Sequence, residues 1–283
     1  MADAWPTVDA ISTTWSMFRD GQRISMASMT IDSIPVAEGL ADDLGGGPDT
    51  EAHSHAEQFS AWAGLVAVAL FVAGSLVAGS APRPDATTGE VTTFLVQHRS
   101  ALLFGTALIL LSVPFFGCFV GLLAGMLRDA EGGRAPLAGA ATVGWVLLLA
   151  IASIGILVQV ALTWRGADRA DPGMVRFVYD VSSLSTYAVS ATAVALSVGA
   201  TSFIIFRTRM VPRWIAVFGL VEIVGNLVEV GGMASREGLN AGGYGAGVGP
   251  LLWAAWVAAM AIALVRCIGR ERAGSRAAVV VLD

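Results

Sequence analysis

Residues 100–127 read SALLFGTALILLSVPFFGCFVGLLAGML and contain no acidic or basic residue. A helix needs about 20 mostly apolar residues to cross the hydrocarbon core of a bilayer, so this stretch is long enough for one crossing. Three more uncharged runs occupy residues 58–82, 135–164 and 181–206. These four runs predict membrane-spanning helices.

Two further apolar segments extend the pattern. Residues 214–235 include Glu222 and Glu229, and the last segment begins near Pro250 and ends at Arg266. The predicted fold class is all-α, a polytopic membrane bundle of six transmembrane helices with a mostly disordered N-terminal tail. The spans are predicted at about residues 60–81, 101–127, 137–163, 181–206, 214–234 and 250–267.

The chain is predicted to have three parts: an acidic tail of residues 1–57, a transmembrane domain of residues 58–268 and a short basic tail of residues 269–283. The first tail is rich in Gly, Ser, Asp and Pro, which favours disorder. A short surface helix within it is the alternative, since four apolar residues follow roughly helical spacing: Val8, Ile11, Trp15 and Phe18.

The overall composition excludes several classes of protein. Of the 283 residues, 55% are hydrophobic and 14% are charged, whereas an ordinary soluble domain has about 25% charged residues. The formal net charge of -5 disfavours binding to nucleic acid, so no nucleic-acid partner is predicted. Cys118 and Cys267 lie far apart in the chain, which excludes a disulfide framework and a four-thiolate metal site.

The distribution of arginine predicts an orientation. With six spans both termini share one side, and nine arginines lie near span ends on that side against six on the other. The positive-inside rule then predicts cytoplasmic N- and C-termini in the cell membrane, with the lipid bilayer as surroundings. The first span argues the other way, because Arg83 follows it closely and no basic residue lies just before it.

Two short helices are predicted on the outer side. Thr87 and Glu90 have the spacing of a capping box, and Val91, Phe94 and Leu95 follow at helical intervals before span two. A similar approach to span four occupies residues 171–177.

Three short segments are EVTTFLVQHR at residues 90–99, LRDAEG at residues 127–132 and RTRMVPRW at residues 207–214. They resemble segments of a family of uncharacterised actinobacterial six-pass integral membrane proteins. With the span pattern, the resemblance covers about residues 60–270. The family is one of unknown function, so the resemblance implies a six-helix fold and carries no catalytic residue to this chain.

The acids within the fifth span are the main functional candidates. Ionisable groups inside a membrane are costly and point to function by default. Glu222, Asn226 and Glu229 lie along one helix face, and Glu222 falls about 13 Å from Arg213, near the middle of the span. Gln159, Asp180 and Tyr187 are predicted to join them in a polar or ion site. The alternative is that these groups only hold helices together by hydrogen bonds.

A glycine ridge in span two predicts close helix packing. Gly117, Gly121 and Gly125 recur every four residues, and small residues at this spacing let another helix approach closely. The partner is either a neighbouring helix of the same chain or a second copy, which would form a homo-oligomer.

Other motifs are interpreted as structural. His53 and His55 lack a third histidine nearby, so no metal site is predicted. The glycine-rich stretch at residues 238–250 does not have nucleotide-binding spacing, and no cofactor is predicted. Most tryptophans fall near span ends, as interfacial aromatics do. No catalytic motif is found, so the protein is predicted not to be an enzyme.

Two functions stay open from the sequence. The favoured one is a membrane protein that handles a small solute, an ion or protons through the polar site on span five. The alternative is a non-transporting scaffold or assembly subunit that packs through the glycine ridge.

Overall fold

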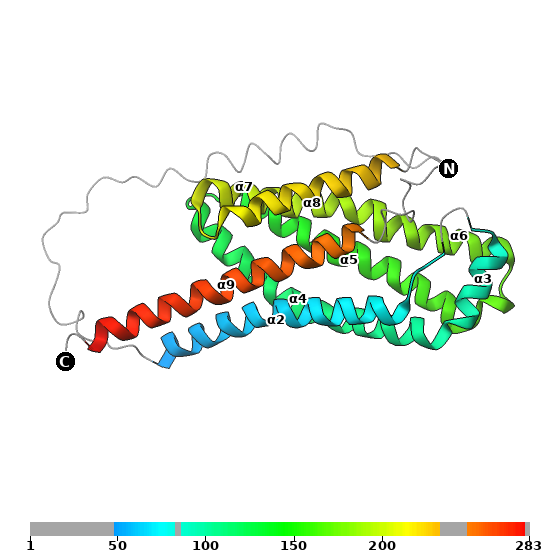
Figure 1. The fold of residues 1–283 in the computed structure, drawn as a ribbon, viewed down its shortest axis with the longest axis horizontal. Helices are drawn as coiled ribbons and strands as arrows, with labels where there is room; N and C mark the ends of the chain where they lie inside the picture. The colour runs from blue at the N-terminus through cyan, green and yellow to red at the C-terminus, as the bar shows by residue number, and fades with distance from the viewer. Residues whose placement is uncertain (1–47, 83–85, 233–247, 281–283) are drawn as a thin grey trace, which may run out of the picture. The chain divides into compact units, whose positions relative to one another are not determined.

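The computed structural model describes residues 48–82, 86–232 and 248–280, and this part of the chain is all-helical. Figure 1 shows the helices and their neighbours. The elements are α2 (Pro48–Ala78), α3 (Thr88–Gln97), α4 (Arg99–Glu131), α5 (Pro136–Arg165), η1 (Ala167–Arg169), α6 (Pro172–Ser183), η2 (Leu184–Val189), α7 (Ser190–Thr208), α8 (Arg213–Gly232) and α9 (Val248–Val280).

Helix α2 begins earlier than the predicted first span. Residues 48–57, which the sequence assigns to the tail, already belong to α2, and His55 is exposed on it. Residues 1–47 of the predicted disordered tail and residues 238–247 of the glycine-rich stretch lie outside the described residues.

Within the described residues, five helices are long and apolar enough to cross a membrane: His55–Ala78, Arg99–Glu131, Pro136–Arg165, Ser190–Thr208 and Gly249–Arg270. Large apolar side chains are exposed on them, among them Phe104, Ile154 and Phe203 at 60%, 60% and 57%. A soluble bundle would cover such faces, whereas a lipid-facing helix leaves them open. The structure is thus that of an integral membrane protein.

The helices pack pairwise around an aromatic core. Helix α4 packs on α2 and α5, α7 packs on α5 and α8, and α9 packs on α2 and α8. The Phe116 ring lies 5.5 Å from that of Trp145 and 5.2 Å from that of Trp253, and Trp145 stacks on Trp256 at 5.8 Å. These rings join residues from α4, α5 and α9.

Several glycines allow the helix backbones to approach closely. A Cβ at Gly144 of α5 would lie 2.7 Å from the backbone nitrogen of Ser197 in α7. Gly74 of α2 and Gly105 of α4 face each other in the same way. The close packing of α5 on α7 and of α2 on α4 therefore requires glycine at these positions.

The predicted ridge on α4 is not one of these contacts. Gly117, Gly121 and Gly125 are exposed, and no described atom outside their own helix lies within 4 Å of a Cβ built on any of them. The expectation of a partner within the same chain is corrected for the described residues, because α4 turns a different face, that of Phe116 and Phe119, to the core. Contact between two copies stays a prediction.

The two predicted short helices are present as α3 and α6, which pack on each other at one end of the bundle (Figure 1). We call this the α3–α6 end. The capping box is confirmed: the Thr87 backbone N–H donates to the Glu90 carboxylate at 2.7 Å, and the Glu90 N–H donates to the Thr87 hydroxyl at 3.3 Å. Asp171 caps α6 by accepting from the Met174 N–H at 3.1 Å.

Helix α6 does not end before the fourth span. It runs through the π-helix η2 into α7, so the predicted span of residues 181–206 begins inside α6. The Ser190 hydroxyl donates to the Ser185 carbonyl at 2.9 Å, five residues back.

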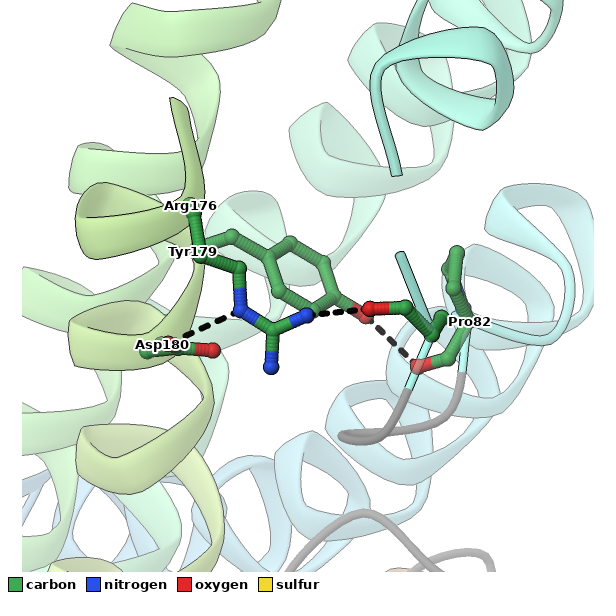
Figure 2. Close-up of polar contacts among 5 residues, drawn as sticks. Pro82, Arg176, Tyr179 and Asp180 are labelled. Carbon is green, nitrogen blue, oxygen red and sulfur yellow. Dashed lines mark hydrogen bonds and ion pairs between the residues drawn. The ribbon is translucent and has the colours of Figure 1, made fainter. Parts of the chain in front are cut away.

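A small apolar cluster and a polar network hold the α3–α6 end together. The cluster consists of Val91, Leu95, Leu102, Leu162, Ala167, Val175 and Tyr179. Figure 2 shows the network, in which the Tyr179 hydroxyl donates to the Pro82 carbonyl at 2.8 Å. Arg176 forms an ion pair with Asp180 at 3.0 Å and also donates to the Ala86 carbonyl. The network links α6 to the segment that follows α2.

Candidate functional site

Helix α8 has one face toward the protein and one face away from it. The buried residues recur at helical spacing and are Ile215, Ala216, Gly219, Glu222 and Asn226. The exposed residues between them are apolar and are Val217, Leu220, Val221, Val224 and Leu227. Glu222 therefore lies on the protein-facing stripe of a helix whose other face is apolar.

The Glu222 side chain is fully buried, with 0% of its surface exposed. Neither carboxyl oxygen has a hydrogen-bond partner among the described residues. Nearly all buried polar atoms in proteins are hydrogen-bonded, so an unpaired buried carboxyl requires an explanation. Burial disfavours an isolated carboxylate, which leaves a neutral acid or a carboxylate paired with a cation as the favourable states.

Asn226, the next residue of the predicted row on α8, does not pair with the Glu222 carboxyl group. Asn226 is buried, and its side-chain amide donates to the backbone carbonyl of Glu222 at 3.0 Å. This bond stays within the helix and does not involve the carboxyl group. Glu229 lies two turns beyond Glu222 on α8, and its side chain lies outside the described residues.

One turn before Glu222, three helices meet at Gly219. A Cβ at this position would lie 2.9 Å from Nε1 of Trp256 in α9 and closer still to the hydroxyl of Ser202 in α7. Trp256 Nε1 donates to the Ile215 carbonyl at 3.0 Å. The Ser202 hydroxyl is buried without a partner among the described residues, which adds a second unpaired polar group in this region of the core.

The other predicted site residues are distributed over different places. Gln159 is half-buried on α5, and Asp180 is engaged by Arg176 at the α3–α6 end. Tyr187 belongs to η2, and its side chain lies outside the described residues. Both α7 and η2 pack against α5 and α8, the helices that carry Gln159 and Glu222. Among the described residues, no hydrogen bond joins the Glu222 carboxyl group to Gln159 or Asp180.

Sequence reasoning missed the tryptophans of the core. Trp145 and Trp256 are 1% and 0% exposed, whereas Trp164 and Trp214 are 67% and 57% exposed. The interfacial interpretation is wrong for the first pair, because they stack on each other inside the bundle. The nitrogens of Trp145 and Trp253 are buried without a partner among the described residues, a feature that no sequence pattern signals.

The described residues contain no group of three His, Cys, Asp or Glu side chains that could hold a metal ion. Comparisons with protein families, curated proteins and solved structures find no match to the chain.

Proposed function

We propose that this chain is a six-span protein of the cell membrane, with α8 as the fifth span, that handles protons, small ions or small solutes through Glu222. The observation that carries the proposal is the full burial of a carboxyl group with both oxygens unpaired among the described residues. Ionisable side chains inside membrane bundles mark ion pathways and proton relays. A group that only joined two helices would have a donor in reach.

Exchange of a proton or cation with water requires a second arrangement of the bundle, because Glu222 is sealed in this one. Helix α8 packs on α7, α9 and η2, so the rearrangement involves these contacts. A π-helical turn such as η2 is frequent at functional sites and offers a place where the helix can change.

Flux measurements on liposomes that contain the purified full chain test the proposal. A pH-sensitive dye inside the liposomes reports proton movement under a pH gradient, and under Na⁺ or K⁺ gradients. We expect flux with the wild-type chain and at least a tenfold loss with Glu222→Gln, which keeps the size of the side chain and removes its proton.

Glu131→Gln is the matched control. The Glu131 carboxylate accepts hydrogen bonds from the first turn of α5 at 3.2 and 2.8 Å, and glutamine keeps an acceptor there. Its flux should equal that of the wild type. Equal flux with Glu222→Gln, or wild-type flux no greater than that of empty liposomes under every gradient, contradicts the proposal.

A non-transporting scaffold is the second candidate, favoured by the outward-facing ridge of Gly117, Gly121 and Gly125. Two such ridges can pack together across a pair of chains. Cys118 is exposed beside the ridge and serves as a natural cross-linking site. In a Cys267→Ala background, oxidation of membranes should give a covalent dimer that Gly121→Leu removes. No dimer in the parent chain would argue against this function.

A further inference from the structure

A cavity of about 310 Å³ opens at the α3–α6 end, away from Glu222. Its wall combines Leu95 and Val96 of α3, Arg99 at the start of α4, and residues 163–169, which include the end of α5 and the turn η1. Three arginines line it, Arg99, Arg165 and Arg169, against a single acid, Asp168. The cavity is therefore electropositive.

The backbone of this turn holds the arginines around the cavity. Gly166 has φ of +88°, and a Cβ there would lie 2.8 Å from the Asp168 carboxylate. A side chain at position 166 is disfavoured by both the backbone conformation and the lack of space. The Arg99 guanidinium donates to the Trp164 carbonyl at 2.6 Å, which fixes it on the wall while leaving its other donors available.

Among the described residues, the other two guanidinium groups have no acidic partner. Arg165 and Arg169 are exposed, and within the described residues the recorded ion pair is that of Arg176 with Asp180. Arginines gathered around a cavity without matching carboxylates repel one another unless an anion enters. Guanidinium forks match the geometry of phosphate oxygens and bind them with paired hydrogen bonds.

We propose that this cavity binds a phosphate group through Arg99, Arg165 and Arg169. Trp164 borders the cavity with 67% of its surface exposed, at the end of a membrane-spanning helix, where aromatic side chains meet lipid headgroups. The group is either the phosphodiester of an anionic lipid or free inorganic phosphate, since both present the same oxygens. The apolar wall of Leu95 and Val96 suits the glycerol part of a lipid.

Binding to the full-length protein distinguishes the two sources. One arm measures the thermal unfolding midpoint in a neutral detergent with increasing inorganic phosphate. The other measures lipid retained after purification from nanodiscs of phosphatidylglycerol or of phosphatidylcholine. We expect stabilisation by phosphate, or preferential retention of phosphatidylglycerol, and at least a tenfold weaker effect in the Arg165→Gln/Arg169→Gln variant.

Arg128→Gln/Arg207→Gln is the matched control, because it removes two exposed arginines at the ends of α4 and α7 and lowers the net charge equally. Its phosphate and lipid binding should equal that of the wild type. The proposal is overturned if the wild type binds neither probe, or if the Arg165→Gln/Arg169→Gln variant binds as the wild type or no worse than the control. This result is independent of the flux through Glu222.

Discussion

At the scale of single residues, we predict that Glu222 lowers the free energy of unfolding of the protein. An unpaired polar group in a protein interior costs about 1–3 kcal/mol, and both Glu222 oxygens are unpaired among the described residues. Glu222→Leu has a similar volume and removes the polar group. We expect it to stabilise the chain by about 1–3 kcal/mol, measured by thermal unfolding in detergent.

Glu131→Leu is the opposite case, because the Glu131 carboxylate caps α5. Its loss should lower stability by about 1 kcal/mol. The measurement is made without added Na⁺ or K⁺. If Glu222→Leu also destabilised the chain there, Glu222 would have a stabilising partner within the protein, contrary to an unpaired carboxyl group.

The sequence predicted that Glu222 lies within an apolar helix, because the surrounding run has no other charge until Glu229. It could not predict the partners of Glu222. Depth along a helix does not fix which residues of neighbouring helices face each other, and Asp180 is held by Arg176 instead. The burial of Trp145 and Trp256 has the same origin, since it depends on how α5 and α9 are rotated in the bundle.

At the scale of helices, the glycines that matter for packing differ from the ridge that the sequence singled out. A Cβ at Gly144 would meet the backbone of Ser197, so Gly144→Ala should destabilise the chain by about 1–3 kcal/mol. A Cβ at Gly121 would have no described atom outside its own helix within 4 Å. Gly121→Ala should therefore leave the stability unchanged or raise it by up to about 1 kcal/mol, because alanine has the higher helix propensity. Thermal unfolding of dilute protein in detergent compares the two. Equal changes in stability for Gly144→Ala and Gly121→Ala would contradict the close contact between Gly144 of α5 and Ser197 of α7.

The start of α3 is predicted to depend on pH. Hydrogen bonds from Thr87 hold the pKa of the Glu90 carboxyl below its usual value. The backbone N–H makes the larger contribution and the hydroxyl the smaller one. Because the pKa is lowered in the folded state, the ionised Glu90 carboxylate stabilises α3 at pH values above the usual pKa of a glutamate. This contribution is lost as the pH falls through the lowered pKa.

Carboxyl-carbon NMR of Glu90 checks this prediction. The wild-type titration midpoint should lie below that of an unstructured glutamate, and Thr87→Val should raise it by removing the hydroxyl donor while keeping the backbone donor. An ordinary midpoint in both proteins would mean that the capping box does not persist in solution.

At the scale of the whole molecule, the number of crossings sets the sides of the termini. Six spans place both termini on one side, whereas five would separate them. We expect green fluorescent protein to fluoresce and alkaline phosphatase to be inactive when fused before Met1 or after Asp283. The same phosphatase inserted after Ala170, between η1 and α6, should be active. Phosphatase activity at either terminus would contradict the proposed orientation.

The bundle was largely predictable because its signals are local. Uncharged runs mark the spanning helices, and the Thr87 and Glu90 pair marks the start of α3 without reference to the rest of the chain. The join between α6 and α7 was not predictable, because a π-helical turn has no distinct composition and arises from the contacts of both helices at once.

That π-helical turn sets how far α6 is rotated about the helix axis relative to α7, because α6, η2 and α7 are continuous. Each residue of an α-helix turns the chain by about 100°, and η2 holds a wider turn than its neighbours. If the same six residues Leu184–Val189 formed a regular α-helix, α6 would rotate by about that angle relative to α7. Tyr179 and Arg176 would then face away from residues 82 and 86. The wider turn of η2 thus keeps α7 in the membrane bundle while α6 faces the α3–α6 end.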